Sequence, residues 1–141
     1  MHKGEYLIIS HKAVNYFVQF AAEGDQGILT EAVSNHFIEP LSAVLTVDDY
    51  ERMTSLGWNG ATCPPPVGRA ARAPKGRCPN FFRNFRLPVD LRELAELAVR
   101  TLREVYQVRT IRELEYKAFS EGGTSIRFPL LSIERREEQP G

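Results

Sequence analysis

Residues 16–37 carry the pattern that most constrains the fold of this chain. Residues 16–22 read YFVQFAA and are dense in aromatic and β-branched side chains, which suit a pleated, half-buried surface. Residues 23–27 (EGDQG) supply two glycines and an acidic turn residue, and residues 28–37 resume the strand pattern. Two such runs joined by a short glycine-containing loop predict a β-hairpin. Because an isolated hairpin is only marginally stable in water, it needs a third strand and a covering helix.

The segments on either side of this hairpin supply both. Residues 5–10 (EYLIIS) form a short apolar run that predicts a first strand, and the three strands together make an antiparallel meander. Thr46 is a good N-cap, and Gly57 suits the left-handed position that follows a helix, so we expect a short helix over residues 47–56. Trp58 is expected to fold back on the last turn of this helix, and a Trp58 exposed on a binding groove is the alternative.

The longest helix is predicted to begin after Asp90, which is a credible N-cap. Apolar side chains recur along it at helical spacing, so this stripe is expected to cover the sheet. The stripe consists of Leu91, Leu94, Ala95, Ala98, Leu102, Val105 and Tyr106. Residues 114–119 and 125–128 alternate as strands do around the turn at 121–123, which predicts a C-terminal hairpin. The charged residues 134–141 are expected to be a frayed tail.

These elements predict an α+β fold, in which the three-strand meander and the C-terminal hairpin form an antiparallel sheet packed against one long and one short helix. At 141 residues, the chain is expected to form a single domain over residues 1–141. The formal net charge is zero, which argues against a polyanion as the main partner. No apolar run is long enough for a membrane span, and the N-terminus lacks the apolar region of a secretory signal, so we expect a cytoplasmic location.

Residues 59–79 differ abruptly in composition from their surroundings. Their prolines and glycines disfavour regular structure, which predicts a loop inserted within the domain. Basic residues in this insert, and the arginines interleaved with Phe81, Phe82 and Phe85 after it, suggest an alternative surface for nucleic acid or for an acidic partner. This basic patch consists of Arg69, Arg72, Lys75, Arg77, Arg83 and Arg86. The plainer interpretation is that the phenylalanines anchor the end of the loop to the core.

The sequence shows no catalytic or metal-ligating constellation. Glu31 and His36 are expected on opposite faces of one strand, where they cannot easily cooperate as an acid and a base. Cys63 and Cys78 lie in the insert without C-x-x-C spacing or a pattern of histidine ligands, so no metal or cofactor is expected. Reduced thiols are the expected state of these cysteines in a cytosol, and a disulfide between them is the alternative.

Several motifs together resemble one family. They are VQFAA (18–22), EAVSN (31–35), LGW (56–58), PNFF (79–82), LAVRTLREVY (97–106) and LEYKAF (114–119). They resemble an actinobacterial group of chaperone-like domains called TY-Chap, which is related to type III secretion chaperones and to YbjN proteins. The resemblance covers about residues 6–131, apart from the insert, which is longer than is typical of the family.

The resemblance implies a non-enzymatic domain that binds a polypeptide segment. The residues that match the family's motifs, and are therefore candidate peptide contacts, are Glu31, Ser34, Asn35, Trp58 and Asn80; they would equally serve to hold the fold. Phe17 and Phe20 complete the candidate set, because large apolar side chains on both faces of the sheet leave a surface for a partner or for a homodimer contact. Capture at an edge strand and capture in an apolar groove beside the long helix both remain open.

Overall fold

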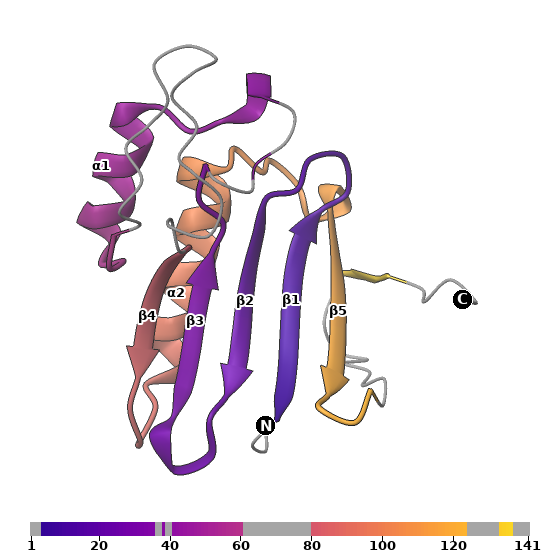
Figure 1. Ribbon diagram of the computed structural model, residues 1–141. Helices are drawn as coiled ribbons and strands as arrows, with labels where there is room; N and C mark the ends of the chain where they lie inside the picture. The colour runs from indigo at the N-terminus through magenta and orange to yellow at the C-terminus, as the bar shows by residue number, and fades with distance from the viewer. Residues whose placement is uncertain (1–3, 36–37, 39–40, 61–79, 124–132, 137–141) are drawn as a thin grey trace.

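The computed structural model describes residues 4–35, 38, 41–60, 80–123 and 133–136. These residues contain one six-stranded sheet with the strand order β4-β3-β2-β1-β5-β6 (Figure 1). The strands are β1 (Glu5–His11), β2 (Phe17–Ala22), β3 (Ile28–Ala32), β4 (Phe81–Phe85), β5 (Leu114–Ser120) and β6 (Glu134–Arg135). Neighbouring strands are antiparallel except for β5 and β6, which are parallel. The expected meander is therefore present as β1, β2 and β3.

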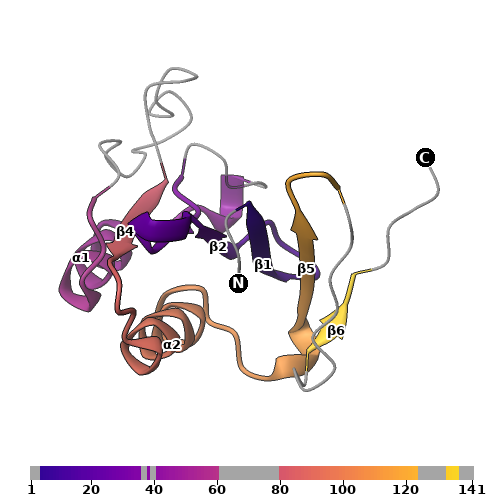
Figure 2. The same ribbon diagram turned by 90° about the horizontal axis from the view of Figure 1, so that it is seen from below.

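Two α-helices accompany the sheet. Figure 2 shows α2 (Leu91–Arg100) below the half of the sheet that contains β4 and β2, while α1 (Val47–Leu56) lies beside β4. The helical path of α2 continues through one π-helical turn at Thr101–Val105, where the N–H of Tyr106 donates to the carbonyl of Thr101. No α-helix lies below β1 and β5 in the part of the chain that the structure describes (Figure 2).

Local capping interactions explain the bounds of α1, which agree with those expected. The hydroxyl of Thr46 accepts a hydrogen bond from the Asp49 N–H at 3.1 Å, and the Asp49 carboxylate accepts one from the Thr46 N–H at 2.8 Å. Gly57 ends the helix with φ of 108°, and the Trp58 N–H then donates to the carbonyl of Met53. Trp58 therefore folds back on the last turn, as the sequence suggested.

Alternation along the strands gives the sheet two different faces. The helix-side face is largely buried and includes Ile9, Val18, Phe20, Ala32, Phe81 and Tyr116. The opposite face, which neither α1 nor α2 covers, is called the open face below. It carries half-buried apolar side chains, which are Tyr6, Ile8, Phe17, Leu29, Phe82 and Phe119. The main core lies between the helix-side face and the two helices.

The third strand is shorter than expected. It ends at Ala32 instead of continuing to residue 37, of which residues 36–37 lie outside the described part of the chain. After β3, the N–H of Val33 still donates to the carbonyl of Phe17, but the next two residues leave the ladder. Ser34 and Asn35 instead bond to residues that are distant in sequence, and these bonds direct the chain away from the sheet.

Two further segments differ from the expectation. Phe81–Phe85 is not only a loop anchor, because it forms the edge strand β4 with Phe81 and Phe85 buried on the helix side. The charged tail is ordered at its start, where Glu134 and Arg135 pair in parallel with β5 and Glu134 forms an ion pair with Lys12 at 2.5 Å. The second strand of the expected C-terminal hairpin, residues 125–128, lies outside the described residues.

Candidate functional site

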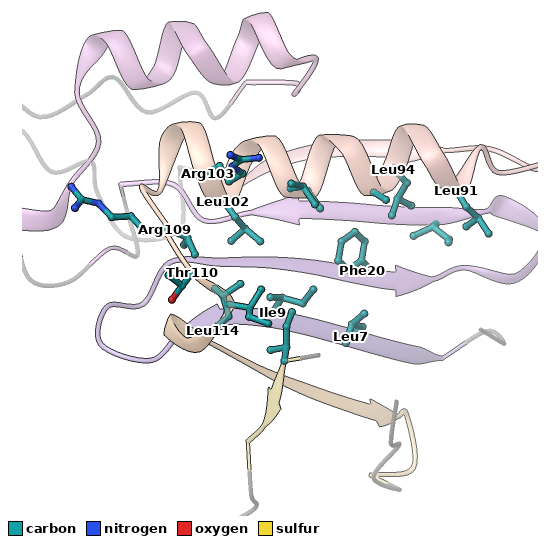
Figure 3. A pocket seen from close by; sticks show the side chains of 17 residues that line it. Leu7, Ile9, Phe20, Leu91, Leu94, Leu102, Arg103, Arg109, Thr110 and Leu114 are labelled. Carbon is teal, nitrogen blue, oxygen red and sulfur yellow. The ribbon is translucent and has the colours of Figure 1, made fainter. Parts of the chain in front are cut away.

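An apolar groove lies between α2 and the part of the sheet that this helix leaves uncovered (Figure 3). Its volume is about 510 Å³, and 14 of its 17 lining residues are apolar. The sheet side of the groove consists of Leu7, Ile9, Phe20, Ile28 and Leu114. The helix side consists of Leu91, Leu94, Ala95, Ala98, Val99 and Leu102. The groove therefore presents a large apolar area with almost no hydrogen-bonding groups.

The groove also collects apolar side chains that are unusually exposed. Five large hydrophobic residues are exposed in the described part of the chain, and three of them line the groove: Leu91 at 66%, Val99 at 51% and Ile111 at 53%. The other two, Val47 and Leu87, lie elsewhere. Single exposed hydrophobic residues are normal on a protein surface, whereas large exposed apolar patches are typical of interaction sites.

The helix-side lining corrects the expectation that the whole apolar stripe covers the sheet. The C-terminal part of the stripe is buried, whereas Leu91 and Ala95 are exposed in the groove. Leu97, which the stripe omitted, is buried instead. The reason is that α2 lies over β2 and its neighbours, so that no other α-helix in the described part of the chain packs against its side toward β1 and β5 (Figure 2).

Polar lining residues gather at one end of the groove. Arg103, Arg109 and Thr110 lie where the chain leaves α2 and crosses toward β5 (Figure 3). Both arginines are exposed, and neither forms an ion pair within the residues that the structure describes. This end of the groove is consequently positive, while the opposite end near Leu91 is apolar.

Four of the sequence-predicted contacts support the fold instead of lining the groove. The N–H of Ser34 donates to the side-chain oxygen of Asn80 at 3.1 Å. The side-chain amide of Asn35 donates to the carbonyl of Leu45 at 2.9 Å and accepts from its N–H at 2.6 Å. These bonds join the segment after β3 to the residues before α1 and before β4.

Trp58 is the fourth of these supporting residues. It is only 3% exposed, and its indole N–H donates to the hydroxyl of Thr101 at 2.9 Å. The Thr101 hydroxyl in turn donates to the carbonyl of Leu97 at 2.7 Å. Trp58 therefore holds the π-helical turn that carries Leu102 and Arg103, both of which line the groove.

The remaining predicted contacts lie on different surfaces. Phe20 is part of the groove, whereas Phe17 and Glu31 are half-buried on the open face. Glu31 stands opposite Gln19 on β2 and opposite Phe82 on β4. Burial raises the pKa of the Glu31 carboxyl above its ordinary value of 4.5. The candidate contacts predicted from the sequence therefore fall into three groups, which line the groove, lie on the open face or support the fold.

The alternative basic patch is described only at its end. Arg83 forms an ion pair with Glu93 and lies over the ring of Phe85 at 4.7 Å, and Arg86 is exposed. Arg69, Arg72, Lys75 and Arg77 lie outside the described residues, as do Cys63 and Cys78. Within the described ranges, no group of three His, Cys, Asp or Glu side chains is placed to hold a metal ion, and no helix is both long and apolar enough to cross a membrane.

The fold and the groove define a small α+β domain with an apolar site beside its long helix. Comparison with known families adds a name to this class, because residues 1–120 match the family TY-Chap3, described as "T3SS (YopN, CesT) and YbjN peptide-binding chaperone 3". The chain belongs to this family, which confirms the resemblance inferred from its motifs. Neither the curated proteins nor the solved structures gave a significant match to the chain.

Sequence reasoning predicted a groove beside the long helix as one of two modes of capture but identified only Phe20 among its lining residues. The exposed residues Leu91, Val99 and Ile111 were missed, as were Arg103 and Arg109. The length of the apolar stripe was a signal for Leu91. A stripe of about four helical turns is longer than the part of a helix that packs on a few strands, so residues at its end can stay exposed. Nothing in the local sequence distinguishes the part of that stripe that stays uncovered.

Proposed function

We propose that this chain binds a segment of another polypeptide in the groove between α2 and strands β1, β2 and β5, without catalysing a reaction. The observation that carries the proposal is the groove itself, in which 14 of 17 lining residues are apolar and three large ones are exposed. The same role is supported by the family to which the chain belongs, because that family is described as peptide-binding chaperones. A cytoplasmic location remains part of this proposal.

The energetics favour reversible binding. Burying one leucine side chain contributes about 1.5–3 kcal/mol, and association costs about 4–15 kcal/mol in lost translational and rotational freedom. Five apolar anchors at about 2.5 kcal/mol each, less an association cost near the lower figure of about 4 kcal/mol, leave about 8 kcal/mol, which corresponds to a Kd on the order of micromolar. Such an affinity suits a chaperone, which must release its partner.

Within this proposal, the candidate contacts have two different roles. Phe20 touches the bound segment directly, because it lies on the sheet side of the groove. Ser34, Asn35, Trp58 and Asn80 act indirectly, because their hydrogen bonds fix the segments that position α2. Phe17 and Glu31 lie on the open face, which offers a second surface for the same partner or for a second copy of the chain.

A pair of matched substitutions tests the proposal. Val99→Glu places a carboxylate in the groove, and Val47→Glu places one at an equally exposed valine of α1 that is outside the groove. Both helices tolerate the change, because a carboxylate at position 99 is four residues before Arg103 and one at position 47 is in the first turn of α1. The probe is a fluorescent amphipathic peptide of about 15 residues with leucines at helical spacing.

Fluorescence anisotropy should show binding to the wild-type chain and to Val47→Glu, and binding roughly tenfold weaker or absent for Val99→Glu. Far-UV circular dichroism checks that both variants remain folded. Equal affinity of the two variants for the peptide would contradict the groove as the binding site, and failure of the wild-type chain to bind would contradict the function.

A further inference from the structure

We infer that the segment bound in this groove is an amphipathic α-helix whose C-terminal turn carries carboxylate side chains and lies at Arg103 and Arg109. This inference rests on the proposed function and adds the chemistry of the partner. It follows from three features of the groove. These are the lack of free backbone hydrogen-bonding groups on its central strands, its dimensions and its charge.

The two central strands on the sheet side of the groove, β1 and β2, offer no free backbone groups to a ligand. β1 is hydrogen-bonded to β2 on one side and to β5 on the other, and β2 is hydrogen-bonded to β1 and β3. An extended segment laid across these strands would bury N–H and C=O groups without partners, at a cost of about fivefold to more than a hundredfold in affinity for each group. A helix satisfies these groups internally, so a helix is the form of polypeptide that this groove accepts.

The dimensions of the groove also fit one helix. Leu91 and Leu102 mark its helix side, and the 11 residue steps between them span about 17 Å, which is about three helical turns. β1 and β5 are adjacent strands about 4.8 Å apart, so the width of these two strands, which no α-helix among the described residues covers, matches the spacing of about 8–10 Å between packed helices. A bound helix would lie beside α2 and extend the helix layer over β1 and β5 (Figure 2).

The charge at the arginine end of the groove sets the direction of the bound helix. The side chains of Arg103, Arg109 and Thr110 are the only polar ones among the described residues that line the groove, and all three lie at this end (Figure 3). A helix C-terminus carries partial negative charge, which the two guanidinium groups would complement. Carboxylates in the last turn of the bound helix add to this attraction.

The acidic residues near the arginine end of the groove already have partners within the chain. The carboxylate of Glu104 pairs with Arg100 at 2.7 Å and with Arg52 at 3.7 Å. The carboxylate of Glu113 accepts hydrogen bonds from the backbone N–H groups of Arg109 at 2.7 Å and Thr110 at 2.9 Å. The guanidinium groups of Arg103 and Arg109 therefore remain available for a ligand carboxylate.

The test compares two leucine-striped peptides of about 15 residues that differ only in their last turn, which carries either two glutamates or two lysines. Each is titrated against the wild-type chain and against the double variant Arg103→Glu/Arg109→Glu. The wild-type chain should prefer the glutamate peptide by roughly threefold to fivefold, as expected for two exposed ion pairs, and the preference should fall with added salt. The double variant should prefer the lysine peptide.

A third peptide, identical to the glutamate peptide but with a central proline, tests the helical form because proline breaks a helix. Its affinity should be at least roughly tenfold lower. Equal binding of the proline peptide would overturn the helical form, and a charge preference that is absent or unchanged in the double variant would overturn the acidic end. In both cases peptide binding would still uphold the proposed function, whereas no binding by any peptide would overturn the function and this inference together.

Discussion

The hydroxyl of Tyr106 donates a hydrogen bond of 2.9 Å to the carbonyl oxygen of Val33, and this bond joins the end of the π-helical turn to the residue that follows β3. Tyr106 is also stacked on Tyr16, with ring centroids 4.8 Å apart. Burial raises the pKa of Tyr106 well above its ordinary value of 10.0, so the hydroxyl stays protonated and remains a donor at neutral pH. This contact holds the C-terminal side of the groove-forming helix against the sheet.

Tyr106→Phe should therefore lower the free energy of unfolding by about 0.5–1.5 kcal/mol, because it removes one buried hydrogen bond and leaves the carbonyl of Val33 without this donor. Urea denaturation measures the change. Tyr6→Phe on the open face is the control, since the Tyr6 hydroxyl forms no hydrogen bond within the described residues, and it should change stability by less than about 0.5 kcal/mol. Equal effects of the two substitutions would show that the Tyr106 bond contributes nothing.

Asn35→Ala should be more damaging. It removes both hydrogen bonds to the backbone of Leu45, which is only 3% exposed, so a buried N–H and a buried C=O each lose their partner. We expect a loss of about 2–5 kcal/mol in the free energy of unfolding. Asn84→Ala, at an exposed position on the edge strand β4, should stay within about 0.5 kcal/mol of wild type. A similar small effect at Asn35 would mean that its amide does not hold the segment before α1.

Two leucines of the same stripe should respond differently to truncation. Leu102 is 6% exposed, and Leu102→Ala should cost about 2–5 kcal/mol because it leaves a cavity in the core. Leu91 is 66% exposed, and Leu91→Ala should change the free energy of unfolding by less than about 0.5 kcal/mol. Chemical denaturation of both variants measures the two changes in the free energy of unfolding. Equal losses for Leu91→Ala and Leu102→Ala would show that the stripe is buried throughout.

Glu31 should make stability depend on pH. Its pKa in the folded chain is raised by burial, so the folded state disfavours the charged form and loses stability as pH rises from below the ordinary value of 4.5 through the raised value. Glu31→Gln removes this effect and should unfold at a higher urea concentration than wild type at neutral pH. The difference should vanish well below pH 4.5. A variant less stable than wild type at neutral pH would reverse the sign and show that the carboxylate is stabilised by a partner.

The parts of the fold that could be predicted from sequence are those with local signals. The bounds of α1 follow from a capping residue at one end and a left-handed glycine at the other, and both act within a few residues. The end of β3 could not be predicted, because it depends on hydrogen bonds to residues distant in sequence. Ser34 bonds to Asn80, and Asn35 bonds to Leu45. Strand β4 was missed for a similar reason, since its five residues are stabilised by pairing with a strand about 50 residues earlier.

The candidate site was predictable only in outline. The apolar stripe of α2 and the apolar strands were visible, and so was the prospect of a groove beside the long helix. Which side chains line that groove depends on where α2 lies across the sheet, and tertiary packing alone decides this. The same placement buries Leu102 and exposes Leu91, although both occupy the same stripe in the sequence.

The central claim is that the bound polypeptide occupies the groove and not the open face, and methyl NMR of the wild-type chain titrated with the leucine-striped glutamate peptide tests it most directly. We predict chemical-shift changes at the methyl groups of Leu91, Val99 and Ile111, which line the groove, and no change at the methyl groups of Ile8 and Leu29 on the open face. Shifts confined to Ile8 and Leu29 would contradict binding in the groove and place the binding site on the opposite side of the sheet.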